Sequence, residues 1–167
     1  TDGDHDDDID VHVSDYTLVK TASINGVAVD ESTKAKIGDQ IDYTVKLTST
    51  GDAAVDVPDV SDTMFTRTLV AGSLKLNGTE TSLVNDKVHV GTLAAAGVSG
   101  DTATITYSYV VTSADKGVSN VAMTDGDHDD DIDVHVSDYT LEKSASINGT
   151  PVTDKTIAKV NDVISYT

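Results

Sequence analysis

A close internal duplication limits what this chain can fold into. The first 18 residues, TDGDHDDDIDVHVSDYTL, recur unchanged at 124–141, which is an offset of 124 − 1 = 123 residues. The match extends over 1–44 against 124–167, where 32 of 44 positions are identical. A period of this length is too long for a solenoid unit and suits a whole domain. The sequence therefore predicts tandem repeats of about 123 residues.

The duplication also predicts how the chain is divided. Residues 1–14 are expected to end a preceding repeat, 15–137 to form one complete β-sandwich repeat, and 138–167 to begin the next. A domain normally closes its own core. We therefore expect the last segment to need a continuation or a neighbouring chain to cover its apolar face.

Short alternating runs of apolar and polar residues fill the chain, and no stretch has helical periodicity over three turns. The runs are Ile9–Val13, Leu18–Asn25, Gln40–Ser49, Ala54–Met64, Ser73–Leu83, Lys87–Leu93, Thr102–Thr112, Gly117–Thr124 and 132–136. The acidic tract 125–131 is expected to turn between the last two. This pattern predicts an all-β fold built as an antiparallel β-sandwich.

The differences between the two copies indicate which face of the first strand is buried. Val19 is replaced by Glu142, whereas the even-numbered residues from Leu18 to Ile24 recur unchanged. Successive residues of a strand face opposite sides. We therefore expect the odd-numbered face in solvent, and Lys20 on the face that enters the core.

Charge and composition exclude several classes of function. Lys and Arg total 11 and Asp and Glu total 29, so the net charge is −18. This charge argues against nucleic acid and against an anionic membrane surface as partners, and it favours solubility and cation binding. The sequence has no cysteine, which excludes disulfides, thiolate metal sites and cysteine nucleophiles. No apolar run is long enough to span a membrane, and anchors or export signals are expected outside this sequence.

A series of motifs follows one order along 18–137. They are VKTASINGVAV, KIGDQIDYTVKLTSTGDAAVDVPDVSDTM, VAGSLKLNGTE, GTLAAAG and GVSNVAM. Their order and spacing resemble the conserved tandem repeat domain of bacterial and archaeal cell-surface proteins. One departure is FTRTL at Phe65–Leu69, where that family often has a Pro-Gly turn. The resemblance implies an immunoglobulin-like sandwich in extracellular stalks, adhesins and surface layers. Related fimbrial and collagen-adhesin-type domains include some that form an internal Lys–Asn isopeptide bond and others that lack it.

Three polar residues fall on apolar faces of the predicted strands: Lys20, Asp62 and Asn120. Burial lowers the pKa of a lone ammonium, and a neutral desolvated amine is a competent nucleophile. Together with the resemblance, this predicts an autocatalytic Lys20–Asn120 isopeptide bond, with Asp62 as the carboxyl that moves protons. Asp42 is set aside because it shares the polar face of its strand. The alternative is an inward Lys20–Asp62 ion pair, with Asn120 capping a backbone turn.

The acidic tract occurs twice and could bind a hard cation. Alternate carboxylates can converge on Ca²⁺ in Asp-rich turns. The candidate ligands are Asp125, Asp127, Asp129 and Asp131, with Asp2, Asp4, Asp6 and Asp8 in the first copy. The alternative is a solvated acidic hairpin that repels neighbouring edges. His128 and His135 lie at polar positions of this region and are expected on a solvated face. No other cofactor is expected.

These observations favour a structural function over turnover catalysis. We expect a tandem repeat of an extracellular surface protein that serves as a stalk, filament or sheath element. Its expected partners are neighbouring repeats of the same chain and other copies in a filament or surface layer. The alternative is an adhesin domain, with or without Ca²⁺, that holds a host or matrix ligand.

Overall fold

The computed structural model describes residues 11–30, 32–137, 142–153 and 155–167. The chain separates into two compact units, of which the first ends at Ser137 and the second begins at Asp138. Apart from one short 3-10 helix, η1 (Thr63–Thr66), the regular elements of the described residues are strands. The prediction of an all-β fold is confirmed.

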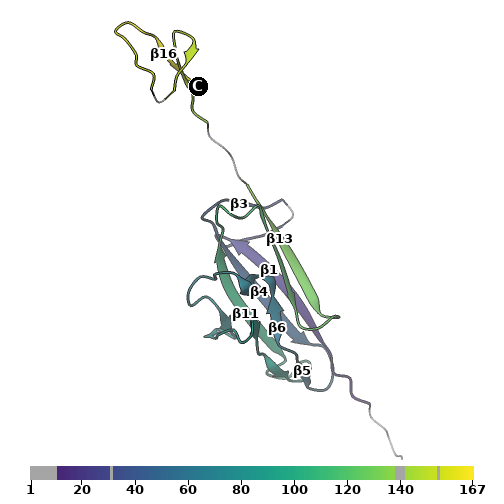
Figure 1. The fold of residues 1–167 in the computed structure, drawn as a ribbon. Helices are drawn as coiled ribbons and strands as arrows, with labels where there is room; N and C mark the ends of the chain where they lie inside the picture. Colours follow the sequence, from purple (N-terminus) through teal and green to yellow (C-terminus); the bar gives the residue numbers. More distant parts are fainter. Residues whose placement is uncertain (1–10, 31, 138–141, 154) are drawn as a thin grey trace, which may run out of the picture. The chain divides into compact units, whose positions relative to one another are not determined.

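The larger sheet of the first unit has six strands in the order β2-β1-β4-β11-β7-β8, all antiparallel to their neighbours (Figure 1). Their bounds are β1 (Tyr16–Ile24), β2 (Val27–Ala28), β4 (Gln40–Ser49), β7 (Lys75–Leu76), β8 (Thr79–Glu80) and β11 (Thr102–Val110). The long strands β1, β4 and β11 form its centre, because β4 pairs along its length with both of the others.

A five-stranded sheet has the order β3-β13-β12-β6-β9. Its strands are β3 (Lys34–Ala35), β6 (Val60–Asp62), β9 (Lys87–Val88), β12 (Gly117–Met123) and β13 (Asp129–Val136). Only the β3–β13 pair of this sheet is parallel. Two further strands, β5 (Val55–Val57) and β10 (Gly91–Leu93), pair with each other.

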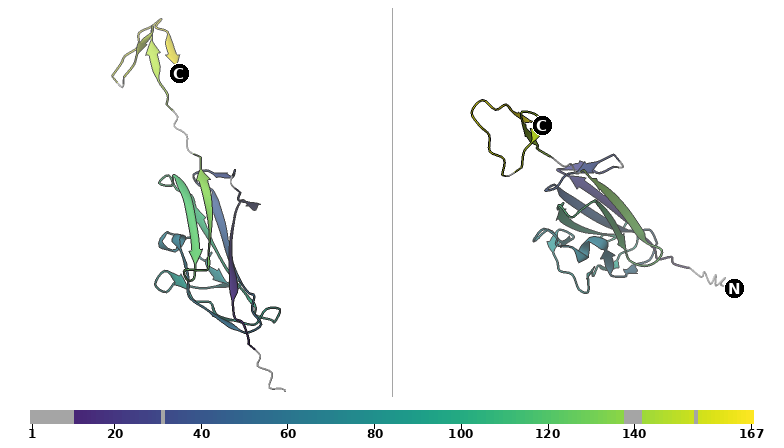
Figure 2. Two further views of the ribbon diagram at one scale, coloured as in Figure 1. Left: turned by 90° about the vertical axis from the view of Figure 1, so that its right-hand side faces the viewer. Right: turned by 45° about the horizontal axis from the view of Figure 1, so that its top comes forward.

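The two sheets turn their apolar faces to one shared core. Alternate residues of β4 point inward, and Ile41, Tyr43, Val45 and Leu47 are at most 1% exposed. Tyr43 lies opposite Tyr107 of β11, and their stacked rings are 5.2 Å apart. Side chains of β12 and β13 belong to the same buried cluster. In Figures 1 and 2 the long strands of both sheets run along this core.

The run Ala54–Met64, predicted as one strand, is interrupted at Pro58. β5 pairs with β10, whereas β6 pairs with β12 and β9, so the chain changes sheets between them. Proline has no backbone N–H to donate to a ladder, which explains why the strand stops there. The run Lys87–Leu93 is likewise divided into β9 and β10.

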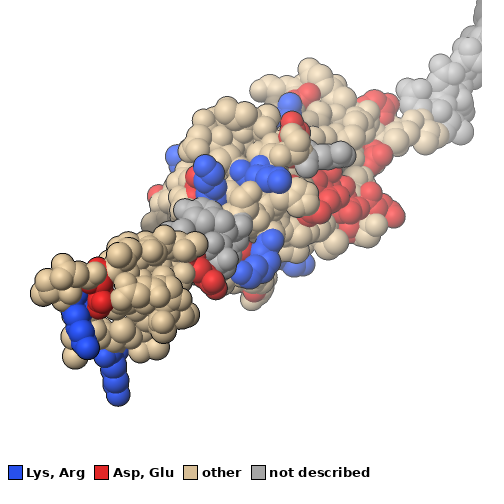
Figure 3. Space-filling view, turned by 90° about the horizontal axis from the view of Figure 1, so that it is seen from above, with Lys and Arg blue, Asp and Glu red and all other residues tan. Residues whose placement is uncertain are grey.

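The acidic tract is less of a turn than the sequence predicts. β13 begins at Asp129, so residues 129–131 are already paired with β12. Along β13, Asp129, Asp131 and Asp133 are exposed. Figure 3 shows acidic side chains gathered on one flank of the molecule, while basic side chains are scattered.

The predicted strand at Ile9–Val13 is wrong for the residues that the structure describes. Val11–Val13 are not in a strand, and Ile9 lies outside the described residues. This segment is instead held by the loop after β4, where the Val13 N–H donates to Asp52 Oδ1 at 2.7 Å and the Ala53 N–H donates to the Val13 carbonyl at 3.2 Å. The same residues at 134–136 do form a strand, because β12 lies beside them.

The second unit repeats the pairing of the first. It is a three-stranded sheet, β15-β14-β16, with β14 (Ala145–Ile147), β15 (Thr150–Pro151) and β16 (Ile164–Tyr166). The register Ile147↔Ile164 and Ala145↔Tyr166 equals that of β1 with β4, shifted by 123 residues. The Asn148-Gly149 turn has positive φ at both residues, 51° and 82°, as the Asn-Gly hairpin rule requires.

The second unit leaves its apolar face uncovered. Ile164 is 45% and Tyr166 66% exposed, whereas their counterparts Ile41 and Tyr43 are 0% and 1% exposed. All the buried positions of 16–44 carry the same residue in both copies: Tyr16, Leu18, Lys20, Ala22, Ile24, Ala35, Ile41 and Tyr43. Each differing position that the structure describes is exposed or half-buried, Val19 among them. The expectation that the unchanged face enters the core is confirmed.

Candidate functional site

Lys20 enters the core because β1 alternates between the core and solvent. It takes an inward position between Leu18 and Ala22, and the residue is 4% exposed. Its Nζ lies 5.4 Å from the centre of the Tyr43 ring and 5.8 Å from that of Tyr107. Burial lowers the pKa of Lys20, and the negative charge of Asp62 opposes that shift.

Asp62 ends β6 and begins the short helix η1. Its Oδ1 accepts a hydrogen bond from the Met64 N–H at 2.8 Å, which makes it the N-cap of this helix. Its Oδ2 accepts from Lys20 Nζ at 2.5 Å and from the Tyr107 hydroxyl. The side chains of Lys20 and Asp62 are both 0% exposed. The hydrogen bond to the helix therefore fixes the Asp62 carboxyl in place, while Oδ2 accepts from the Lys20 amine.

Asn120 reaches the same point from β12 and is 0% exposed. Its Nδ2 donates to the Tyr107 hydroxyl at 3.0 Å, and its Oδ1 accepts from Thr63 Oγ1 at 3.0 Å. Thr63 Oγ1 in turn accepts the backbone N–H of Val121 at 3.1 Å. Asn120 thus has a hydrogen-bond partner on each side of its carboxamide.

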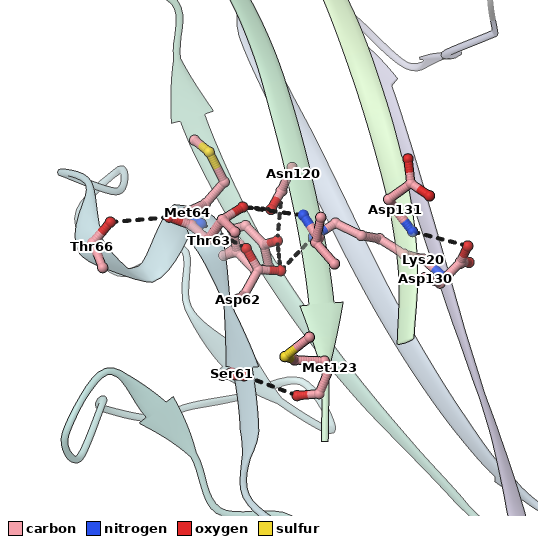
Figure 4. A network of polar contacts seen from close by, with 12 residues as sticks. Lys20, Ser61, Asp62, Thr63, Met64, Thr66, Asn120, Met123, Asp130 and Asp131 are labelled. Carbon is pink, nitrogen blue, oxygen red and sulfur yellow. Dashed lines mark hydrogen bonds and ion pairs between the residues drawn. The ribbon is translucent and has the colours of Figure 1, made fainter. Parts of the chain in front are cut away.

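The three predicted residues lie in one hydrogen-bonded network (Figure 4), although they come from β1, β6 and β12. The path runs from the Lys20 amine to Asp62, then to the Tyr107 hydroxyl, and then to the carboxamide of Asn120. Among the described contacts, no hydrogen bond joins Lys20 directly to Asn120. Asp42, which the sequence argument sets aside, accepts from Gln40 and Ser108 and is not part of this network.

Sequence reasoning missed two members of the network. Tyr107 had a signal, because it shares the inward face of β11 with Ile105 and Tyr109, but an aromatic residue there suits a core equally well. Thr63 had none, because the short helix that aims it at Asn120 is not visible in the strand pattern.

A second tyrosine hydroxyl lies in the same core without a hydrogen bond. Tyr43 Oη is buried and has no hydrogen-bond partner in the described part of the chain. The Asn120 amide is close enough to lower the pKa of Tyr43, but burial dominates and raises it. Tyr43 therefore differs from Tyr107 in this one respect, although the two rings stack on each other.

The second unit already brings the counterpart lysine to its tyrosine. Lys143 Nζ lies 4.8 Å from the centre of the Tyr166 ring, as Lys20 lies against Tyr43. These two residues come from the repeated segment, whose antiparallel strand pairs, β1 with β4 and β14 with β16, are called the repeated hairpin below. Asp62, Tyr107 and Asn120 lie in 45–123, outside the stretch that is repeated within residues 1–167.

The acidic tract makes mostly local contacts. Asp125 Oδ1 accepts from the backbone N–H groups of Asp127 and His128, each at 3.1 Å. In the described residues no group of three or more His, Asp or Glu side chains is arranged to hold a metal ion. Asp2, Asp4, Asp6 and Asp8 lie outside the described residues. The expectation of Ca²⁺ binding by Asp125, Asp127, Asp129 and Asp131 stays a prediction.

His128 fastens this tract to the start of β1. Its ring stacks on Tyr16 with centroids 4.1 Å apart, and its two nitrogens contact Asp125 at 2.9 Å and Asp15 at 3.1 Å. The side chain is 22% exposed, so the expected solvated position is wrong for His128. His135, the other histidine considered, is exposed.

This contact predicts a pH-dependent stability. The hydrogen bond to Asp125 raises the pKa of His128 above its ordinary value of 6.5. A group whose pKa is higher in the folded state than in the unfolded state stabilises the fold fully at pH values below its unfolded-state pKa. That contribution is lost as the pH rises through its folded-state pKa. The facing carboxyls of Asp125 and Asp15 have lowered pKa values, so their contributions are lost only in acid, below about 3.8.

We therefore expect His128→Gln to lower the free energy of unfolding most near pH 5, and progressively less towards about pH 8. Chemical denaturation at a series of pH values measures this difference, with the exposed His135→Gln as the matched control. A difference that stays constant across the range would contradict the prediction.

The comparisons with known proteins found no match. No family model, no curated protein and no solved structure matches this chain. In the described residues no helix is long and apolar enough to cross a membrane.

Proposed function

We propose that the first unit is one immunoglobulin-like β-sandwich repeat of an extracellular surface protein. It serves as a stalk, filament or sheath element, and an autocatalytic isopeptide bond between Lys20 and Asn120 stabilises it. The observation that carries this proposal is that Lys20, Asp62 and Asn120 are buried together in one hydrogen-bonded network. They lie on three separate strands that are far apart in the sequence, so their meeting in one network agrees with the bond that the sequence and its resemblance predict.

The chemistry of the bond needs a neutral amine in a dry site. Burial favours both conditions, because it lowers the pKa of Lys20 and keeps water from the carboxamide. Asp62 takes the ammonium proton and leaves the amine free to attack Asn120 Cγ. The carboxamide loses ammonia, and an amide then joins β1 to β12.

The cross-link would stabilise the fold mainly by restricting the conformations of the unfolded chain. A bond from residue 20 to residue 120 closes a loop of about 100 residues, worth roughly 4–5 kcal/mol in the chain-entropy model. Unlike a disulfide, this amide cannot be reduced. It suits a cysteine-free protein that carries load outside the cell.

The repeated hairpin supports the tandem part of the proposal. The second copy keeps all the inward-facing residues of the first, including the lysine and the tyrosine beside it. Surface positions have changed while core positions have not. We infer that each complete repeat builds the same core and the same bond, and that neighbouring repeats are its partners.

The mass of the intact chain under denaturing conditions tests this function. We expect the purified protein to be lighter than its sequence by one ammonia, and a proteolytic digest to yield one branched peptide that contains Lys20 and Asn120. A mass equal to that of the sequence would reject the bond. The loss of one water instead would place the amide on Asp62 and exclude Asn120 as the acceptor.

A further inference from the structure

Tyr107 lies between the carboxyl and the amide nitrogen that must leave. Its hydroxyl donates to Asp62 Oδ2 and accepts from Asn120 Nδ2 at 3.0 Å. A phenol has a single proton, and an amide NH₂ group can only donate, so the direction of both bonds is set by the partners. The proton of Tyr107 therefore faces Asp62, and its lone pair faces the amide nitrogen.

The orientation of the Asn120 amide is fixed independently. Thr63 Oγ1 accepts the N–H of Val121, so its own proton is available to Asn120 Oδ1. This places the oxygen of the carboxamide towards Thr63 and the nitrogen towards Tyr107. A flipped amide would set the NH₂ group against the threonine and the oxygen against a hydroxyl already committed to Asp62.

Loss of ammonia requires a proton at Nδ2, because an amide nitrogen does not leave as an anion. Asp62 is the acid of the site, but none of the described hydrogen bonds joins Asp62 to Asn120. The hydroxyl of Tyr107 is the group that contacts both. Burial raises the pKa of Tyr107, so the phenol stays protonated and is suited to carry a proton without holding a charge.

We propose that Tyr107 is a catalytic proton relay, which passes the proton of Asp62 to the departing nitrogen of Asn120. This inference rests on the proposed isopeptide bond and assigns a further residue to its formation. Thr63 assists by donating to Oδ1, where negative charge develops as the amine attacks.

The protons balance over the whole reaction. Lys20 begins as an ammonium and gives one proton to Asp62. The neutral amine attacks Asn120 Cγ, which forms the new C–N bond. Asp62 then gives its proton to Tyr107, and Tyr107 gives its own to Nδ2. The C–Nδ2 bond breaks and neutral ammonia departs, while Asp62 takes the remaining surplus proton from the new amide nitrogen. Lys20 has lost two protons in total, of which Nδ2 carries one away and Asp62 holds the other.

The rate of bond formation in Tyr107→Phe tests this role, with Tyr43→Phe as the matched control. Both changes remove one buried hydroxyl from the same ring pair, but of the two hydroxyls only that of Tyr107 donates to Asp62 among the described hydrogen bonds. The chain is recovered unfolded from inclusion bodies and refolded by dilution. Samples taken at intervals are denatured, and their intact mass is measured by mass spectrometry. We expect Tyr107→Phe to slow the loss of ammonia by at least about 100-fold, the lower range for a general acid. Tyr43→Phe keeps the ring beside Lys20 and removes a hydroxyl that has no hydrogen bond to Asp62, so it should slow the reaction far less.

If Tyr107→Phe does not fold, 3-fluorotyrosine placed at 107 and separately at 43 serves the same purpose. The fluorine makes the phenol more acidic with little change in size, so the rate should change much more at 107 than at 43. Equal rates for both positions, in either experiment, would overturn the relay. A failure of the unaltered chain to lose ammonia would overturn the isopeptide bond itself, and this outcome is distinct from the first.

Discussion

Lys20→Ala is expected to abolish the loss of ammonia and to destabilise the first unit severely. Two effects act in the same direction. The variant lacks the amine that forms the cross-link, and losing the cross-link removes roughly 4–5 kcal/mol in the chain-entropy model. It also leaves the buried Asp62 carboxyl without the Lys20 nitrogen beside it, and a buried polar group that loses its partner costs about 1–3 kcal/mol.

The duplication supplies the control for this experiment. Lys143 is the same residue at the same place in the repeated hairpin, but residues 1–167 hold one set of Asp62, Tyr107 and Asn120, and that set meets Lys20. Lys143→Ala should therefore keep the loss of ammonia and change the unfolding free energy of the first unit by less than about 0.5 kcal/mol. Intact mass and chemical denaturation of both variants make the comparison. Equal behaviour of the two would refute the assignment of Lys20.

Ile41→Ala is expected to cost about 2–5 kcal/mol of unfolding free energy, as a large-to-small change in a closed core does. Ile41 is 0% exposed and lies in β4 between Ile24 of β1 and Tyr109 of β11. The change removes three buried methyl or methylene groups, and the surrounding strands are too constrained by their ladders to close the space.

Ile164→Ala is the matched change in the second copy. Ile164 pairs with Ile147 in the same register, yet it is 45% exposed. Its truncation should change the unfolding free energy of the first unit by less than about 1 kcal/mol, since Ile164 is not among the residues of the buried core cluster. The two variants have identical composition, so the difference reports the site alone. A comparable cost at both positions would contradict this prediction.

Alternation predicted the long strands well and the short ones poorly. Gln40–Ser49 is β4 as predicted, because its Ile, Tyr, Val and Leu residues all face one way. The run Ala54–Met64 looks equally regular. Pro58 is a reason for the strand to stop, but alternation does not show that β5 and β6 then pair in different sheets. Alternation shows that one face is buried without showing which sheet buries it.

The polar residues of the site, like the strands, were only partly predictable from the sequence. Lys20, Asp62 and Asn120 stood out because a polar residue on an apolar face needs a partner. Their partners were less visible. Tyr107 lies on the inward face of β11, where an aromatic residue suits core packing equally well, and Thr63 is positioned by a helix of a single turn. Hydrogen-bond partners depend on how strands from different sheets face each other, which no local pattern encodes.

The sequence by itself determined which face of each long strand is apolar, where the Asn-Gly turns fall, and how the repeated hairpin pairs. The second unit demonstrates this, because its register matches that of the first without the rest of the fold. Only the tertiary structure decided burial and the final partners. The residues Val-His-Val are a strand at 134–136 and none at 11–13, since a strand exists only where another strand accepts its hydrogen bonds. Lys20 and Asn120 were likewise brought to one network by the packing of two sheets, and not by any feature of the segments that contain them.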